Sequence, residues 1–147
     1  MQDKRNPAEY VMALSATLSG TTEAEGEWID VQDFDSLTFI VSTGTVTDAG
    51  TTSGFAFEVE DGDDTTDAGA TPVADADLIG VESDLTVTAD TDDNKVIGTI
   101  GYRGTKRYVR MTATGTTGTN AVVSVVGILA DGRMQHTATV GTTSAAT

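Results

Sequence analysis

The chain has 147 residues, and its 23 acidic side chains outnumber 8 lysines and arginines, which gives a formal net charge of -15 at pH 7. This length suits one domain with a buried core. Cysteine is absent, which excludes disulfides, thiolate nucleophiles and Cys-ligated zinc. The acidity predicts no nucleic-acid partner, because phosphate backbones are bound mainly through cations.

No apolar run is long enough to cross a bilayer. The longest, Ala121–Ala130, is interrupted by Ser124 and Gly127. The N-terminal residues lack the sustained apolar core of a signal peptide. We therefore expect a soluble protein with no membrane partner.

Composition predicts an all-β fold. The chain contains 27 threonines, which favour strands, and 16 glycines, which favour turns. Alanine, leucine, lysine and glutamate form no helical stripes.

The N-terminal segment allows two interpretations. Asn6, Pro7 and Glu9 match the start of a short capped helix. The stretch that follows, residues 10–20, is only loosely periodic and fits a strand equally well. Residues 1–22 are therefore predicted to be an arm or a first strand.

Strand patterns become clearer from residue 27 onward. Residues 27–31 and 36–42 alternate apolar and polar positions, and residues 54–60 do so strictly, with Phe55, Phe57 and Val59 on one face. Residues 43–54 and 61–77, rich in Gly, Asp and Thr, are predicted to be loops.

Four further segments complete the predicted set of about eight short strands. Residues 84–89 and 94–101 read as strands, and residues 106–114 form a hairpin with residues 121–130. The last of these is apolar on both faces, which is typical of a strand at the centre of a sandwich or against a partner subunit.

These patterns predict one antiparallel β-sandwich domain over residues 23–133, jelly-roll-like or immunoglobulin-like, with extended terminal arms. The second arm is the polar C-terminal tail, residues 134–147.

The sequence offers no catalytic set. His136, the only histidine, lies in the polar tail, and no nucleophile-elbow motif is present. Acidic loops at residues 61–67 and 90–94 hold oxygen ligands of the kind that calcium uses, but their spacing does not match an EF-hand. We expect solvated acidic loops, no cofactor, no metal, no small-molecule substrate and no enzymatic activity.

The basic residues are concentrated in one stretch. Residues 6–94 contain 21 acids and no Lys or Arg, whereas Arg103, Lys106, Arg107 and Arg110 lie within eight positions of one another. On a strand, Tyr108 and Arg110 would face outward, opposite Val109 and Met111. Either these cations offset acids of the same subunit across the sheet, or they meet the acidic surface of a neighbouring copy or partner.

Several blocks, in order, resemble a known family: "EWIDVQDFDSLTFIVSTGTVTD", "FEVEDGDD", "PVADADLIG" and "IGYRGTKRYVRMTATGTTGTNAVVSVVGIL". Over roughly residues 27–130 the chain is similar to small acidic virion proteins of tailed bacteriophages, of the capsid decoration or cement type. The block "GYRGTKRYVR" is the most specific of these.

The resemblance implies a non-enzymatic homotrimer on the capsid exterior that binds the major capsid protein and stabilises coat-subunit junctions. A tail, head-fibre or receptor- or glycan-binding module of the virion is the alternative. The predicted interface residues, taken from the basic stretch and the doubly apolar strand, are Arg103, Lys106, Arg107, Tyr108, Arg110, Val122, Val126 and Ile128. The arm Met1–Tyr10 is a further candidate for subunit contacts.

Overall fold

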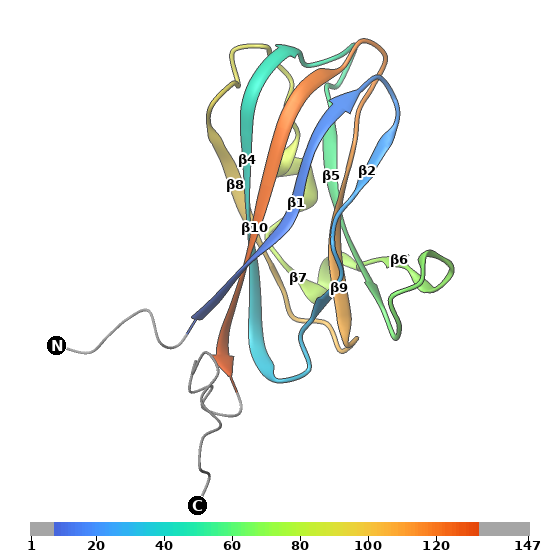
Figure 1. The fold of residues 1–147 in the computed structure, drawn as a ribbon, viewed down its shortest axis with the longest axis vertical. Helices are drawn as coiled ribbons and strands as arrows, with labels where there is room; N and C mark the ends of the chain where they lie inside the picture. The colour runs from blue at the N-terminus through green and yellow to red at the C-terminus, as the bar shows by residue number, and fades with distance from the viewer. Residues whose placement is uncertain (1–7, 133–147) are drawn as a thin grey trace, which may run out of the picture.

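The computed structural model describes residues 8–132, which form two antiparallel β-sheets packed face to face (Figure 1). This confirms the predicted all-β sandwich. The predicted tail at residues 134–147 and the start of the N-terminal arm, residues 1–7, lie outside the described residues.

The first sheet, sheet A, contains five strands. In spatial order they are β1 (Ala8–Ser19), β10 (Asn120–Gly132), β4 (Phe34–Asp48), β8 (Val96–Tyr102) and β7 (Leu78–Ile79).

The second sheet, sheet B, is shorter along its strands. In spatial order it contains β2 (Glu23–Glu25), β9 (Tyr108–Thr114), β5 (Ala56–Gly62) and β6 (Thr71–Pro72), and β3 (Ile29–Asp30) also pairs with β9. Three single-turn 3₁₀ helices occur between β5 and β8: η1 (Asp67–Gly69), η2 (Asp75–Asp77) and η3 (Glu82–Leu85).

The strands pair in a nested order. The first strand, β1, pairs with the last, β10; β2 pairs with β9, β4 with β8, and β5 with β6, all antiparallel. A long hairpin rolled up on itself produces this order, and it is the strand arrangement of a jelly roll. Of the two predicted topologies, the strand order therefore matches the jelly-roll-like one.

The core fills the space between the sheets. Phe39 and Val41 from sheet A and Phe55, Val59 and Met111 from sheet B are almost completely buried. Phe55 also packs edge-on against its neighbour Phe57, with ring centroids 5.9 Å apart. Alternation along each strand places these side chains inside, because successive residues point to opposite faces.

Residues 26 and 27 join the two sheets along one open side. Gly26 N–H donates to the Met111 carbonyl of β9 at 3.0 Å, and Glu27 N–H donates to the Ala13 carbonyl of β1 at 2.8 Å. A Cβ at position 26 would lie 2.4 Å from both carbonyl oxygens, so only glycine fits there. Of the predicted strand over 27–31, only Ile29–Asp30 forms a strand, paired with β9.

Two predicted segment types were wrong. Residues 84–89 form no strand: η3 ends at Leu85, and Val87 makes only an isolated bridge with Phe55. The Leu85 and Val87 side chains are both buried. The apolar–polar alternation of residues 84–89 therefore reflected burial beneath β5 and not hydrogen bonding to a neighbouring strand. The predicted loop over 43–54 begins as strand, because β4 continues to Asp48 along β10.

The N-terminal segment takes the strand alternative. Ala8–Ser19 pairs with β10 along nearly its whole length, with one irregularity between Met12 and Leu14. This strand is an integral edge of sheet A (Figure 1).

Replacement of the central core side chain should destabilise the fold strongly. We expect Phe39→Ala to lower the free energy of unfolding by about 3–5 kcal/mol, because it leaves a cavity between the sheets. Ile40→Ala, one residue along the same strand but facing outward, should cost only about 1 kcal/mol. Urea unfolding in dilute solution measures both, and equal losses would contradict the assigned facing of β4.

Candidate interaction surface

Strand β10 has one buried and one partly exposed face. Ala121, Val123, Val125 and Leu129 point into the core and are buried. The alternate side chains, which include Val122, Val126 and Ile128, point outward and are only partly covered. β10 therefore has a strand on each side within its sheet, as expected for a strand at the centre of a sandwich. Its outer face is not covered by any other part of the described chain.

The register of the neighbouring strands extends this outer face across the sheet. Ile128 lies between Tyr10 on β1 and Thr38 on β4. One row further along, Val126 lies between Met12 and Ile40. Directly paired residues of antiparallel strands point to the same side of a sheet, so each row is a continuous strip of surface.

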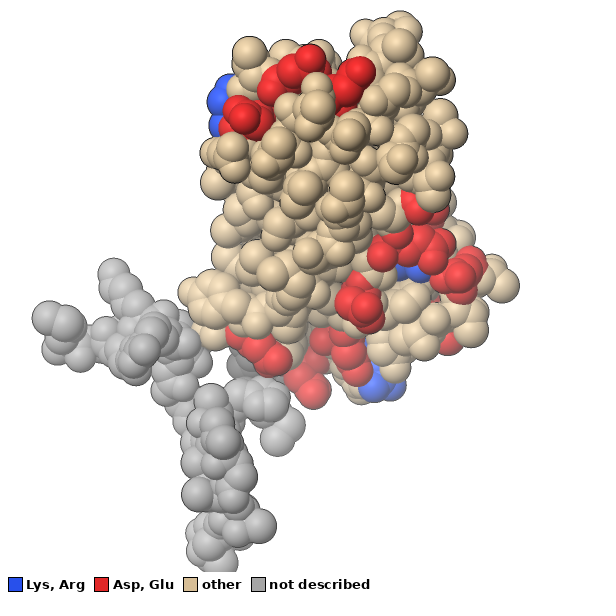
Figure 2. Space-filling view, turned by 45° about the horizontal axis from the view of Figure 1, so that its top comes forward, with Lys and Arg blue, Asp and Glu red and all other residues tan. Residues whose placement is uncertain are grey.

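We call this surface the neutral face, because none of its side chains carries a charge. It consists of outward-facing residues in the middle rows of sheet A: Tyr10, Met12, Ser15, Thr17, Thr38, Ile40, Ser42, Ile79, Val96, Thr99, Val122, Ser124, Val126 and Ile128. Asp48, which pairs with Asn120 at the end of β4, lies outside it. Figure 2 shows a broad uncharged area in the middle of the molecule, with acidic groups above and below it.

The exposed large apolar side chains gather on the neutral face. Within residues 8–132 they are Tyr10, Met12, Ile79, Val81, Val96 and Val122, and all except Val81 belong to it. Tyr10 is 62% exposed and Met12 is 57% exposed. An uncharged surface that gathers the exposed apolar side chains of an acidic protein is typical of a site that contacts another molecule.

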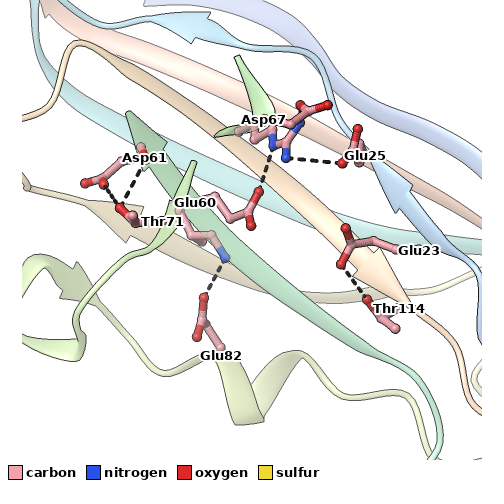
Figure 3. Close-up of polar contacts among 10 residues, drawn as sticks. Glu23, Glu25, Glu60, Asp61, Asp67, Thr71, Glu82 and Thr114 are labelled. Carbon is pink, nitrogen blue, oxygen red and sulfur yellow. Dashed lines mark hydrogen bonds and ion pairs between the residues drawn. The ribbon is translucent and has the colours of Figure 1, made fainter. Parts of the chain in front are cut away.

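Arg110 forms the centre of a buried ionic cluster on the outer side of sheet B. Its guanidinium contacts Glu60 at 2.7 Å, Asp67 at 2.8 Å and Glu25 at 3.3 Å, from β5, η1 and β2 (Figure 3). The Trp28 ring lies 4.6 Å from its Cζ atom. Arg110 faces outward as predicted, yet its side chain is only 4% exposed because these groups cover it.

The other cations of the basic stretch also bind within the subunit. Lys106 pairs with Asp63 at 2.5 Å, and Arg107 pairs with Asp30 at 2.8 Å. The hydrogen bond from Arg107 lowers the pKa of Asp30 below its usual range. These pairs and those of Arg110 confirm that the three cations offset acids of the first two-thirds of the chain.

Two members of the predicted interface set make different contacts. Arg103 donates from Nε to the Ala76 carbonyl at 3.0 Å. The Tyr108 ring lies beneath the Arg107 guanidinium, 5.0 Å from its Cζ atom. The structure thus separates the predicted interface residues into two groups. Those at positions 103–110 lie in the loop between β8 and β9 and on β9, whereas Val122, Val126 and Ile128 lie on the neutral face of sheet A.

The loop between β8 and β9 is held by Tyr102. Its hydroxyl donates to Asp61 Oδ2 at 2.9 Å and accepts from Lys106 N–H at 3.0 Å. Burial, together with the bond to Asp61, raises the pKa of Tyr102 above its usual value. Gly104 is required beneath the ring, because a Cβ there would lie 2.4 Å from the tyrosine oxygen. The cation-bearing loop is therefore rigidly placed.

Two shallow cavities of about 450 and 230 Å³ adjoin this loop and share Val31, Phe34 and Gly104 in their lining. Lys106 and Arg107, which line the larger cavity, are paired with carboxylates, and Arg103, which lines the smaller one, donates from Nε to the Ala76 carbonyl.

Other site types find no support in the part of the chain that the structure describes. No group of three or more His, Cys, Asp or Glu side chains is placed there to hold a metal ion. Asp61 and Asp64, in the acidic loop considered for calcium, bond instead to Thr71 and Thr66. No helix within residues 8–132 has the length and apolarity to span a membrane. His136 lies outside the described residues.

Glu82 closes the free edge of β5. Its Oε1 accepts the Val59 N–H at 2.5 Å, which supplies the acceptor that a neighbouring strand would otherwise provide (Figure 3). Burial raises the pKa of Glu82 above its usual value, and nearby Glu58 and Asp75 contribute. Burial also raises the pKa of Glu58, with contributions from Glu60 and Glu23.

Sequence reasoning missed two groups of residues. The partners of Arg110, which include Trp28 and Glu60, come from distant strands and carry no local signal. The members of the neutral face on β4 did carry one: Thr38, Ile40 and Ser42 alternate with buried positions and include no charge.

Comparison with protein-family models, with curated proteins and with solved structures finds no match for this chain. Its function must therefore be inferred from its own surface and chemistry.

Removal of Arg110 should destabilise the subunit itself. We expect Arg110→Met to lower the free energy of unfolding by about 3 kcal/mol, because Glu60, 15% exposed, loses its partner while Glu25 and Asp67 can turn to solvent. Arg107→Met breaks an exposed pair and should cost at most about 1 kcal/mol. Chemical unfolding distinguishes the two, and an Arg110→Met variant as stable as the parent would contradict the cluster's role.

Mild acidification should stabilise the fold. Glu58 and Glu82 have raised pKa values in the folded state, so their ionised forms destabilise it at pH 7. This penalty disappears as the pH falls toward 4.5, the ordinary glutamate value, so the free energy of unfolding should rise over that interval. Below 3.8 the lowered pKa values of Asp30 and Asp64 reverse the trend.

The Glu82→Gln variant tests this assignment. Glutamine keeps an acceptor for the Val59 N–H but removes the buried charge, so the variant should be more stable at pH 7 and gain less on acidification. Glu27→Gln removes one exposed charge and serves as the control. Identical pH profiles for the two variants, measured by thermal unfolding, would count against a special role for Glu82.

Proposed function

We propose that this protein is a non-enzymatic structural protein that acts through protein–protein contacts. Specifically, it is a cement or decoration protein of a tailed-bacteriophage virion that binds the outer capsid surface and stabilises coat-subunit junctions. The single observation that carries the general proposal is the neutral face. The virion assignment rests on the resemblance of residues 27–130, with "GYRGTKRYVR" as its most specific block.

The distribution of charge supports a contact function. The chain carries a net charge of -15, yet the neutral face, which crosses sheet A from β1 to β7, contains no charged residue. Charged side chains keep soluble surfaces hydrated, and burying them at an interface is costly unless they are paired. A surface without them is suited to being covered by protein.

The rigidity of the subunit supports the same role. Its two sheets are joined by backbone bonds at residues 26 and 27 and by the Tyr102–Asp61 bond, and the Arg110 cluster links β2, β5 and β9 within sheet B. A rigid module loses little conformational entropy on docking. Many copies, each adding a modest contact energy at a subunit junction, would together stabilise a shell.

The glycan-binding alternative has weaker support. Sugar-binding surfaces use aromatic side chains as platforms, and aromatic residues make up only 5% of this chain. On the neutral face Tyr10 is the one aromatic side chain.

The proposal predicts a defined effect on virions. Phage particles from which this gene has been deleted should still assemble but should release their DNA at a lower temperature than the parent particles. Addition of the purified chain should restore the parental release temperature. DNA-binding dye fluorescence during heating measures the release, and mass spectrometry of purified particles shows whether the chain is present. The capsid role would be refuted if the parent particles do not contain the chain. It would also be refuted if the particles made without it are as heat-stable as the parent particles.

A further inference from the structure

We propose that the neutral face is a self-association surface, covered in solution by the same face of a second copy of this chain. This proposal deepens the proposed function, since it names the surface through which copies of a structural protein join. Self-association can be tested on the isolated chain without a capsid, so its outcome is independent of the proposed virion role.

The hydrogen-bonding chemistry of the neutral face is complementary to itself. Its polar side chains all carry hydroxyls, such as Ser15, Thr99 and Tyr10. Ser42 Oγ and Ser124 Oγ already donate within the subunit, to the Ser124 carbonyl and to Met12 Sδ, and can still accept. A hydroxyl both donates and accepts, whereas a carboxylate only accepts and an ammonium only donates. A surface of hydroxyl and aliphatic groups can therefore satisfy an identical surface, with no unpaired charge left in the contact.

The position of the acids limits contacts between copies to this face. Acidic residues flank it at both ends, where the turn at Asp90–Asn94 and the residues Asp33 and Asp35 lie outside the neutral rows. Two chains that each carry a net charge of -15 repel one another at most orientations. Face-to-face contact keeps these acids at the rim, where salt screens their repulsion.

The available area is sufficient for a weak but specific contact. Four strands spaced about 4.8 Å apart, over four rows of outward residues, cover roughly 500 Å² on each copy. Two copies would bury about 1,000 Å² in total, which is near the lower limit for biological interfaces. We therefore expect association in the micromolar range and not an obligate complex.

The test is sedimentation velocity of the full chain from low micromolar to submillimolar concentration, at low and at high sodium chloride. We expect reversible oligomers that become tighter as salt rises, because the apolar contact is insensitive to salt while the acidic rims repel. The expected oligomer is a dimer in which two neutral faces are in contact, and a trimer would contradict this face-to-face arrangement. A chain that stays monomeric throughout would overturn it and would leave the face to a different partner.

Two variants locate the contact. Met12→Lys and Val122→Lys each place one charge on the neutral face, at side chains that are 57% and 41% exposed, so the fold should survive. Each should weaken association by about tenfold or more. Val81→Lys is the matched control, because Val81 is 46% exposed but lies outside the neutral face. Unchanged association in both face variants, or equal loss in the control, would refute this surface as the contact.

Discussion

The position of β10 between β1 and β4 is the constraint on which the rest of the structure depends. It gives sheet A its width, since β1 has no other strand partner and β4 would otherwise pair only with β8. It also determines two surfaces at once. One side of β10 supplies Val123 and Val125 to the core, and the other supplies Val126 and Ile128 to the neutral face. Core and contact surface are thus opposite faces of the same strands.

Electrostatics divides the molecule between its two sheets. Sheet B carries ionic groups on its outer side, where Arg110 and Trp28 are surrounded by carboxylates. Sheet A carries its acids only at the ends of its strands, outside the neutral face. Lys106, Arg107 and Arg110 form ion pairs within the subunit, so the basic stretch offsets acids of the same chain.

Local patterns were sufficient to predict the sandwich but not its details. Strict alternation in residues 54–60 identified β5, and its buried face proved to be Phe55, Phe57 and Val59. Alternation could not show that Leu85 and Val87 are buried without ladder pairing, because a side chain's burial does not require a strand partner. Nor could it show that Arg110 is buried, since its covering groups come from positions 28, 60 and 67. Such contacts depend on tertiary packing, which a local pattern does not encode.

The nested pairing of first strand with last has a consequence for biosynthesis. While the ribosome still holds residues 120–132, β1 and β4 have been made but the strand that belongs between them has not. Their inward side chains, such as Leu14 and Phe39, then have no complete sheet to cover them. Pairing of segments so far apart in sequence is slow, because a long loop must close first. Sheet A therefore becomes complete only after residues 120–132 have left the exit tunnel, and until then the negative charge of residues 6–94 opposes aggregation of the unfinished chain.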